Sequence, residues 1–149
     1  MLKALAVVAA VLLCSNVRSE VTIDIGYLRV DVPLPPVLSN LDPVPEDIGI
    51  AGASTALGEN NTTGRFLGQK YYLIDSRVPV DGDVLAAAQK MLAQTPFMVL
   101  DAPAEVLTAI ADLPEAGGAL LFNTASGDID LRSGNCRGNL LHTLPSDAM

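Results

Sequence analysis

Short apolar runs alternate along the chain with stretches in which apolar residues recur every three or four positions. Five runs have the length and content of strands: residues 21–28, 69–75, 97–100, 119–122 and 140–144. Three stretches between them place apolar side chains on one face of a helix: residues 46–60, 83–92 and 104–113. Strands that alternate with helices indicate parallel pairing through right-handed crossovers. We therefore expect an α/β fold, a three-layer parallel sheet of about five strands with helices on both faces.

The segments around these elements are rich in residues that interrupt or start them. Residues 32–45 carry five of the chain's ten prolines, which predicts an extended connection. The first predicted helix contains Gly49, Gly52 and Gly58. Glycines weaken a helix, so we expect them to allow close packing against the sheet. Residues 145–147 have the pattern of a helix start with a polar cap.

Residues 1–19 have the pattern of a signal peptide, in which Lys3 precedes the apolar run Ala4–Leu13. Cleavage would leave a mature chain of residues 20–149 in the periplasm. Cys14 leaves a second interpretation open, a lipid anchor at that cysteine. The anchor fits less well, because a small residue normally precedes a lipidated cysteine and Leu13 is large.

The charge balance limits the class of partner. The chain has 9 basic and 17 acidic residues, and removing Lys3 and Arg18 with the signal peptide leaves 7 against 17, a net charge of −10. A nucleic-acid partner is not expected, because phosphate binding requires clustered Lys and Arg. An acidic surface is compatible with a cationic ligand, although it also serves solubility.

The residues of covalent and metal chemistry are few. The chain has one histidine, and Cys136 is the only cysteine of the mature part. A histidine-based metal cluster or a CxxC motif is therefore impossible, and no serine lies in a nucleophile elbow. We expect a protein that is not an enzyme and that carries neither a metal nor a cofactor.

A parallel sheet binds ligands beyond the carboxyl ends of its strands. This rule selects four segments: residues 27–31, 101–105, 123–128 and 142–147. Asp101 has a carboxylate that either holds a cation or caps a turn. Asn123, Thr124 and Ser126 either orient a ligand or cap their own loop. His142, in an apolar strand, is either a ligand contact or a core histidine with its nitrogens satisfied.

Two parts of the chain resemble known transport proteins. Gly58–Gln69 is similar to the end of the first helix and the following turn in type I periplasmic binding proteins, the branched-chain amino-acid receptor group. Leu121–Asp128 and Leu131–Ser146 resemble the ABC-transporter substrate-binding proteins associated with PQQ-dependent alcohol dehydrogenase systems. The similarity extends over essentially all of the mature chain and includes the signal peptide.

The resemblance implies the N-terminal lobe of a binding protein, without its final helix, that closes on a small-molecule or ion ligand together with a second lobe across a hinge. In that group the ligand contacts of the first lobe come from the loops after the third, fourth and fifth strands. Carried over to this sequence, the ligand-binding candidates are Asp101, Ala102, Asn123, Thr124, Ser126, His142 and Ser146.

The function that the resemblance implies is solute binding in the periplasm for an ABC import system. Its partners would be an ABC permease and, through the supply of a solute, a PQQ-dependent alcohol dehydrogenase system. The alternative is a non-catalytic periplasmic interaction protein, whose single lobe docks to a dehydrogenase or to another lobe.

Overall fold

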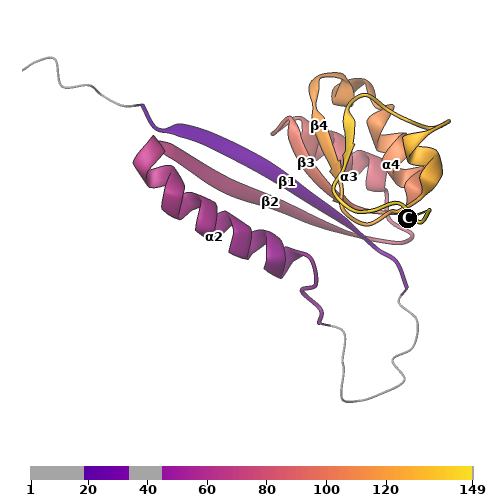
Figure 1. The fold of residues 1–149 in the computed structure, drawn as a ribbon, viewed down its shortest axis with the longest axis horizontal. Coiled ribbons are helices and arrows are strands. Elements are labelled where there is room, and N and C mark those ends of the chain that lie inside the picture. Colours follow the sequence, from indigo (N-terminus) through magenta and orange to yellow (C-terminus); the bar gives the residue numbers. More distant parts are fainter. Residues whose placement is uncertain (1–18, 34–44, 149) are drawn as a thin grey trace, which may run out of the picture.

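The computed structural model describes residues 19–33 and 45–148, where strands and helices alternate as the sequence predicts (Figure 1). The expected signal peptide, Cys14 and most of the proline-rich connection lie outside the described residues. The helices, including two short 3₁₀ helices labelled η, and the strands have these bounds: β1 (Val21–Asp31), α2 (Ile50–Leu67), β2 (Gln69–Pro79), α3 (Val84–Leu92), β3 (Phe97–Asp101), α4 (Ala104–Ala111), η1 (Pro114–Gly118), β4 (Leu120–Asn123), η2 (Ile129–Arg132) and β5 (Leu140–His142).

The five strands are parallel and form one sheet in the order β2-β1-β3-β4-β5. The predicted α/β class, a parallel sheet flanked by helices, is confirmed. Successive residues of a strand point to opposite faces, and one face carries the core, with Leu28, Leu100 and Leu121 fully buried. The helices contribute these core residues: Ala88, Met91, Leu107, Ile110 and Ala116. Each buried leucine or isoleucine stabilises the fold by about 1.5–3 kcal/mol.

α2 covers the other face of the sheet over β1 and β2 (Figure 1). Its close approach depends on Gly64, because a Cβ there would lie 2.6 Å from the main-chain oxygen of Gln69. Asn61 fixes the contact: its side-chain amide donates to the Tyr71 carbonyl at 2.9 Å and accepts from the Tyr71 N–H at 2.8 Å. β2 is an edge strand, so these bonds satisfy main-chain groups that would otherwise be open to another strand.

The predicted helix over residues 46–60 is wrong at both ends. Gly49 has φ 85°, in the left-handed region that glycine adopts most readily, and α2 therefore begins after it. The polar run 60–63 does not end the helix, because Asn60 and Thr62 donate to carbonyls four residues earlier. The helix continues to Leu67 and ends at Gly68, which has φ 70°.

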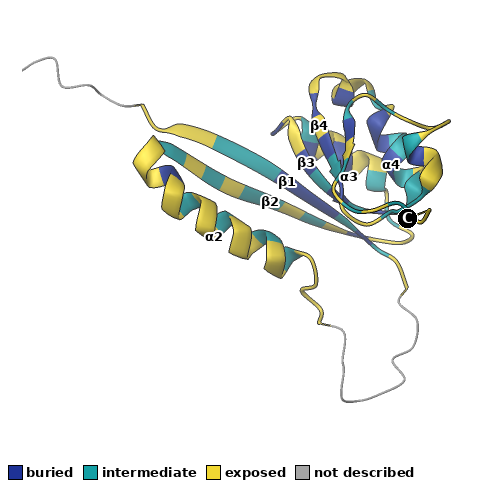
Figure 2. Cartoon of the chain, in the orientation of Figure 1, coloured by how far each residue is buried: buried dark blue, intermediate teal, exposed yellow. Residues whose placement is uncertain are grey.

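The expectation that the helix glycines pack against the sheet is also wrong for two of them. A Cβ at Gly52 or Gly58 would meet no atom within 4 Å, so both face open space. Figure 2 shows the reason: α2 is exposed along most of its length, while the buried residues gather around β3, β4 and α4.

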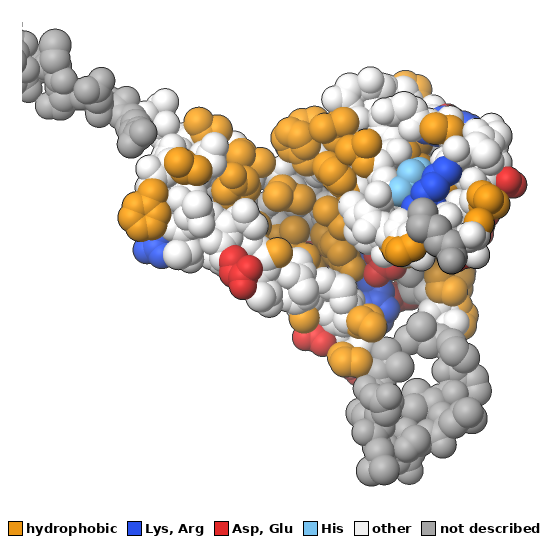
Figure 3. All heavy atoms as spheres, in the orientation of Figure 1, with side chains coloured by type: hydrophobic (Ala, Val, Ile, Leu, Met, Phe, Trp, Pro, Cys, Tyr) orange, Lys and Arg blue, Asp and Glu red, His pale blue; other side chains and the backbone are white. Residues whose placement is uncertain are grey.

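Part of the second sheet face has no cover among the described elements. Apolar side chains from three strands line a shallow groove of about 390 Å³ there, and its residues include Ile23, Ile25, Phe97, Val99 and Phe122. Figure 3 shows this face as a patch of apolar side chains beside helix α2.

The C-terminal part differs from the sequence prediction. Residues 147 and 148 form a turn, and no helix follows β5 within the described residues, in contrast to the helix start expected at 145–147. The connection between β4 and β5 contains η2, which buries Leu131 in the core. None of the helices described is long and apolar enough to cross a membrane.

Candidate functional site

The strand order places a switch point between β1 and β3. From β1 the chain crosses over one face to β2 at the edge, and from β2 it crosses the opposite face to β3. The loops therefore diverge at the carboxyl ends of β1 and β3, which is where parallel sheets bind ligands. Tyr27 and Arg29 of β1 and Asp101 of β3 meet there.

A polar network joins the strands at this point. The Tyr27 hydroxyl donates to Asp101 Oδ2 at 3.1 Å. Arg29 Nε lies 3.8 Å from Asp101 Oδ2 and 3.8 Å from Asp31 Oδ1. Arg77, paired with Arg29 in the β1–β2 register, donates to Asp31 at 2.6 Å. Both guanidinium groups thus have carboxylate partners, and the network is close to neutral.

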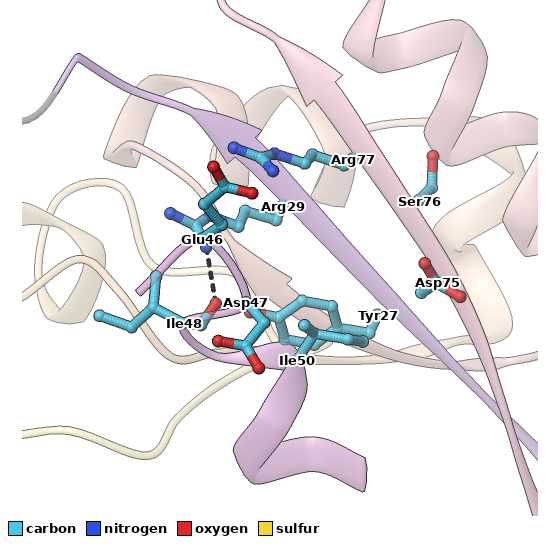
Figure 4. Close-up of a pocket in the computed structure, with 9 residues that line it drawn as sticks. All are labelled: Tyr27, Arg29, Glu46, Asp47, Ile48, Ile50, Asp75, Ser76 and Arg77. Atoms are coloured by element: carbon cyan, nitrogen blue, oxygen red, sulfur yellow. Dashed lines mark hydrogen bonds between the residues drawn. The ribbon is translucent and has the colours of Figure 1, made fainter. Parts of the chain in front are cut away.

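The start of α2 is anchored to the same network. Arg29 donates from Nη1 to the Ile48 carbonyl at 2.6 Å, the bond drawn in Figure 4. Gly49 passes directly over Tyr27, where a Cβ would lie 2.1 Å from the phenol oxygen. Glycine is required here for two reasons, the positive φ and the lack of space.

An open cavity of about 300 Å³ lies between the carboxyl halves of β1 and β2 and the turn before α2; we call it the β1–β2 cavity. Its lining residues are Tyr27, Arg29, Glu46, Asp47, Ile48, Ile50, Asp75, Ser76 and Arg77. Figure 4 shows the two arginines side by side above Ile48, and the Tyr27 ring beside Ile50. The lining therefore combines apolar side chains with charged ones, and we call the charged ones the rim.

Electrostatics at the cavity favour a neutral Tyr27 and a net negative rim. Burial raises the pKa of Tyr27 to about 12, and the Asp101 carboxylate adds to the shift. Of the lining residues two are basic and three acidic, which gives −1, and Asp31 and Asp101 beside them bring the sum to −3. Glu46, Asp47 and Asp75 form no ion pair among the residues described.

A second polar group lies at the carboxyl ends of β4 and β5. Asn123 is fully buried, and its Oδ1 accepts from the main-chain N–H groups of Ala125 and Ser126. Its Nδ2 donates to the Ser126 carbonyl at 2.7 Å and lies 3.0 Å from His142 Nδ1. Thr124 donates its hydroxyl to the Leu100 carbonyl. These side chains hold the loop after β4 against its neighbours.

The predicted site residues therefore separate into two places. Asp101 lies in the network beside the β1–β2 cavity, and Asn123, Ser126 and His142 are brought together at β4 and β5. Ala102 is buried in the core, with 2% of its surface exposed, so its side chain contributes packing. Ser146 is half-buried in the segment after β5.

Sequence reasoning selected residues 27–31 as an edge segment but named no site residue in it. Two features of the sequence indicate a site here. Tyr27 and Arg29 are two positions apart and therefore lie on the same face of β1, and Arg77 follows the second predicted strand. The register that pairs Arg29 with Arg77, and the Gly49 turn that closes the cavity, are tertiary features.

Comparisons with family models, curated proteins and solved structures find no match to this chain. Across residues 19–33 and 45–148, no group of three or more His, Cys, Asp or Glu side chains is placed to hold a metal ion. Cys136 is exposed, and it forms no disulfide within the described part of the chain.

Proposed function

We propose that this protein is the solute-binding component of an ABC import system, acting outside the cytoplasm, and that its solute binds in the β1–β2 cavity. The observation that carries the proposal is the position of this cavity. It lies between the carboxyl halves of β1 and β2 and adjoins the switch point through the Tyr27–Asp101 hydrogen bond.

The solute that fits the cavity is a small organic cation. The arginines of the rim are occupied by Asp31 and Asp101, whereas Glu46, Asp47 and Asp75 remain as carboxylates open to a ligand. The Tyr27 ring and the side chains of Ile48 and Ile50 offer apolar contact to the carbon skeleton of such a ligand. A cation beside an aromatic ring gains a further attraction from the ring face.

Binding without chemistry suits these groups. The basic side chains that could stabilise a developing anion are held in ion pairs, and the Tyr27 hydroxyl, whose pKa is about 12, is protonated across the physiological range. Delivery to a permease, and the link to PQQ-dependent alcohol oxidation, are parts of the proposal that rest on the resemblance of the loop sequences alone.

The alternative function is docking to another protein. The uncovered apolar face around Phe97 and Phe122 favours it, because apolar patches of this kind mark interaction sites. Size-exclusion chromatography with light scattering separates the two: a stable dimer of this chain would support docking, and a monomer that binds cations would support solute capture.

The proposed function is tested by thermal unfolding in the presence of choline, putrescine or agmatine, with sodium chloride at equal ionic strength as reference. A true ligand at a hundredfold excess over its Kd stabilises the folded state by about 2.7 kcal/mol. We expect at least one of these probes to raise Tm.

Matched variants assign the effect to the cavity. The double substitution Asp47→Asn with Asp75→Asn should abolish the rise, while Glu59→Gln, on the exposed surface of α2, should leave it unchanged. If none of the probes raises Tm, or if the double variant keeps the full rise, the proposal is wrong.

A further inference from the structure

Two buried side-chain nitrogens near the carboxyl ends of β4 and β5, Arg132 Nη1 and His142 Nε2, have no hydrogen-bond partner among the residues that the structure describes. Arg132 is the last residue of η2, and His142 is the last residue of β5. Arg132 donates to the carbonyl of Leu144, two residues after His142, so its side chain lies beside the end of β5. Buried nitrogens without partners are rare, and these two lie outside the β1–β2 cavity.

The neighbours of His142 determine which of its nitrogens carries the proton. Asn123 Oδ1 accepts from two main-chain N–H groups, so its Nδ2 is the atom that faces His142. An amide nitrogen only donates, which makes His142 Nδ1 the acceptor. In a neutral imidazole the proton is then on Nε2. The unpartnered atom of His142 is therefore a donor that points away from Asn123.

Arg132 supplies donors of the same kind. Its Nη2 donates to the Leu144 carbonyl, which fixes the guanidinium plane. Nη1 keeps its N–H groups without an acceptor. Arginine stays charged at every accessible pH and matches the geometry of carboxylate and phosphate oxygens. The two unpartnered nitrogens together offer donors and one full positive charge.

We propose that Arg132 and His142 form a binding site for an oxyanion, a carboxylate or a phosphate group, at the carboxyl ends of β4 and β5. One oxygen would accept from Arg132 Nη1, and the same group would accept from His142 Nε2. This site is separate from the cation-binding cavity and does not depend on it.

Both nitrogens are inaccessible to solvent, so an anion enters only when part of the structure around them moves. The segment after β5 is a part that contacts Arg132. The segment is held by the bond from Arg132 to the Leu144 carbonyl and by the Asp147 N–H, which donates to the Gly127 carbonyl at 2.8 Å.

His142 is the only histidine of the chain, so its ring nitrogens give an unambiguous NMR signal in protein without a polyhistidine tag. We would titrate ¹⁵N-labelled protein with sodium acetate and, separately, with sodium phosphate, at constant pH and with sodium chloride keeping the ionic strength constant. We expect a saturable shift of the Nε2 resonance, while Nδ1 keeps the signature of an unprotonated nitrogen. The salt that saturates at lower concentration tells a carboxylate site from a phosphate site.

Variants complete the test. Arg132→Gln should weaken the anion affinity at least tenfold, and Arg132→Lys should weaken it less because the charge remains. Arg137→Gln is the matched control, since Arg137 pairs with Asp112 on the surface and should not affect the affinity. If Arg132→Gln does not fold, His142→Gln with thermal unfolding in acetate replaces it, and the acetate-induced rise in Tm should disappear.

Three results would overturn the site: no saturable shift with either salt, an equal shift with chloride alone, or an unchanged affinity in Arg132→Gln. The Asp47→Asn, Asp75→Asn double variant separates this proposal from the proposed function. It should lose the cation response and keep the oxyanion response.

Discussion

The hydroxyl of Tyr27 donates to Asp101 at 3.1 Å and so joins two strands across 74 positions of the sequence. The bond lies at the switch point of the sheet, beside the β1–β2 cavity and under the turn at Gly49. The bond connects Asp101, which was predicted from the sequence as a site residue, to the β1–β2 cavity, which was not predicted.

Replacing Tyr27 with Phe should test the structural value of this bond. The substitution removes one hydrogen bond to a charged group, and we expect a loss of about 1.5–3 kcal/mol in the free energy of unfolding. Urea unfolding of the two proteins gives the difference. Replacement of Tyr72, whose side chain is exposed, with Phe is the matched control and should change stability by less than about 0.5 kcal/mol. Equal effects of the two substitutions would contradict this role of Tyr27.

The stability of the protein should fall in strong alkali through Tyr27. Its pKa in the folded state is about 12, against an ordinary value of 10.0, because burial and the neighbouring Asp101 disfavour the phenolate. Between these two values the folded state holds a proton that the unfolded state has lost, so stability decreases as pH rises. The contribution is complete below pH 10 and lost as pH rises toward 12. Comparing urea unfolding of wild type and Tyr27→Phe at pH values across this window measures it; parallel curves would contradict the shift.

Gly49→Ala should be strongly destabilising, and Gly52→Ala should be stabilising. At Gly49 an added Cβ meets both a φ of 85° and the Tyr27 oxygen at 2.1 Å, whereas at Gly52 it meets open space within a helix. The strained backbone alone costs about 1–3 kcal/mol, while alanine in place of a helical glycine gains about 1 kcal/mol. Combined with Tyr27→Phe, Gly49→Ala should cost less than the sum of the two single losses, because the closest contact disappears. Thermal unfolding of these three variants and of Tyr27→Phe provides the check, and a neutral Gly49→Ala would contradict the turn geometry.

Asn61 and Asn60 are adjacent, yet they should respond differently to replacement by Ala. Asn61 exchanges two hydrogen bonds with the main chain of Tyr71, and its loss leaves a half-buried N–H and carbonyl on the edge strand. We expect a cost of about 1–3 kcal/mol and faster amide exchange at Tyr71. Asn60 donates only within the exposed surface of α2, so Asn60→Ala should be neutral or slightly stabilising. The same cost at both positions would be incompatible with the edge contact.

The sequence predicted the sheet and its class because strand and helix periodicities are local. The runs at 97–100 and 140–144 were correctly identified as strands, since each is short and apolar. The limits of α2 were not predictable in the same way. The Asn60–Thr63 run is typical of a loop, and it is helical here only because Asn61 has a partner on β2 and the other side chains bond back to the helix.

The candidate site was predicted in part for a similar reason. The rule for parallel sheets identifies Asp101 and the loop after β4 without any knowledge of register. The β1–β2 cavity depends on Arg29 pairing with Arg77 and on the left-handed turn at Gly49, which bring together residues from three separate segments. Neither the pairing nor the turn leaves a periodic signal in the sequence.

The central claim, capture of a small organic cation in the β1–β2 cavity, is tested most directly by isothermal titration calorimetry with the best of the three cation probes. The account predicts one saturable site in the wild type, the loss of that heat in the Asp47→Asn, Asp75→Asn double variant, and unchanged binding in Glu59→Gln. Absence of a saturable heat in the wild type, or equal affinity in the double variant, would contradict it.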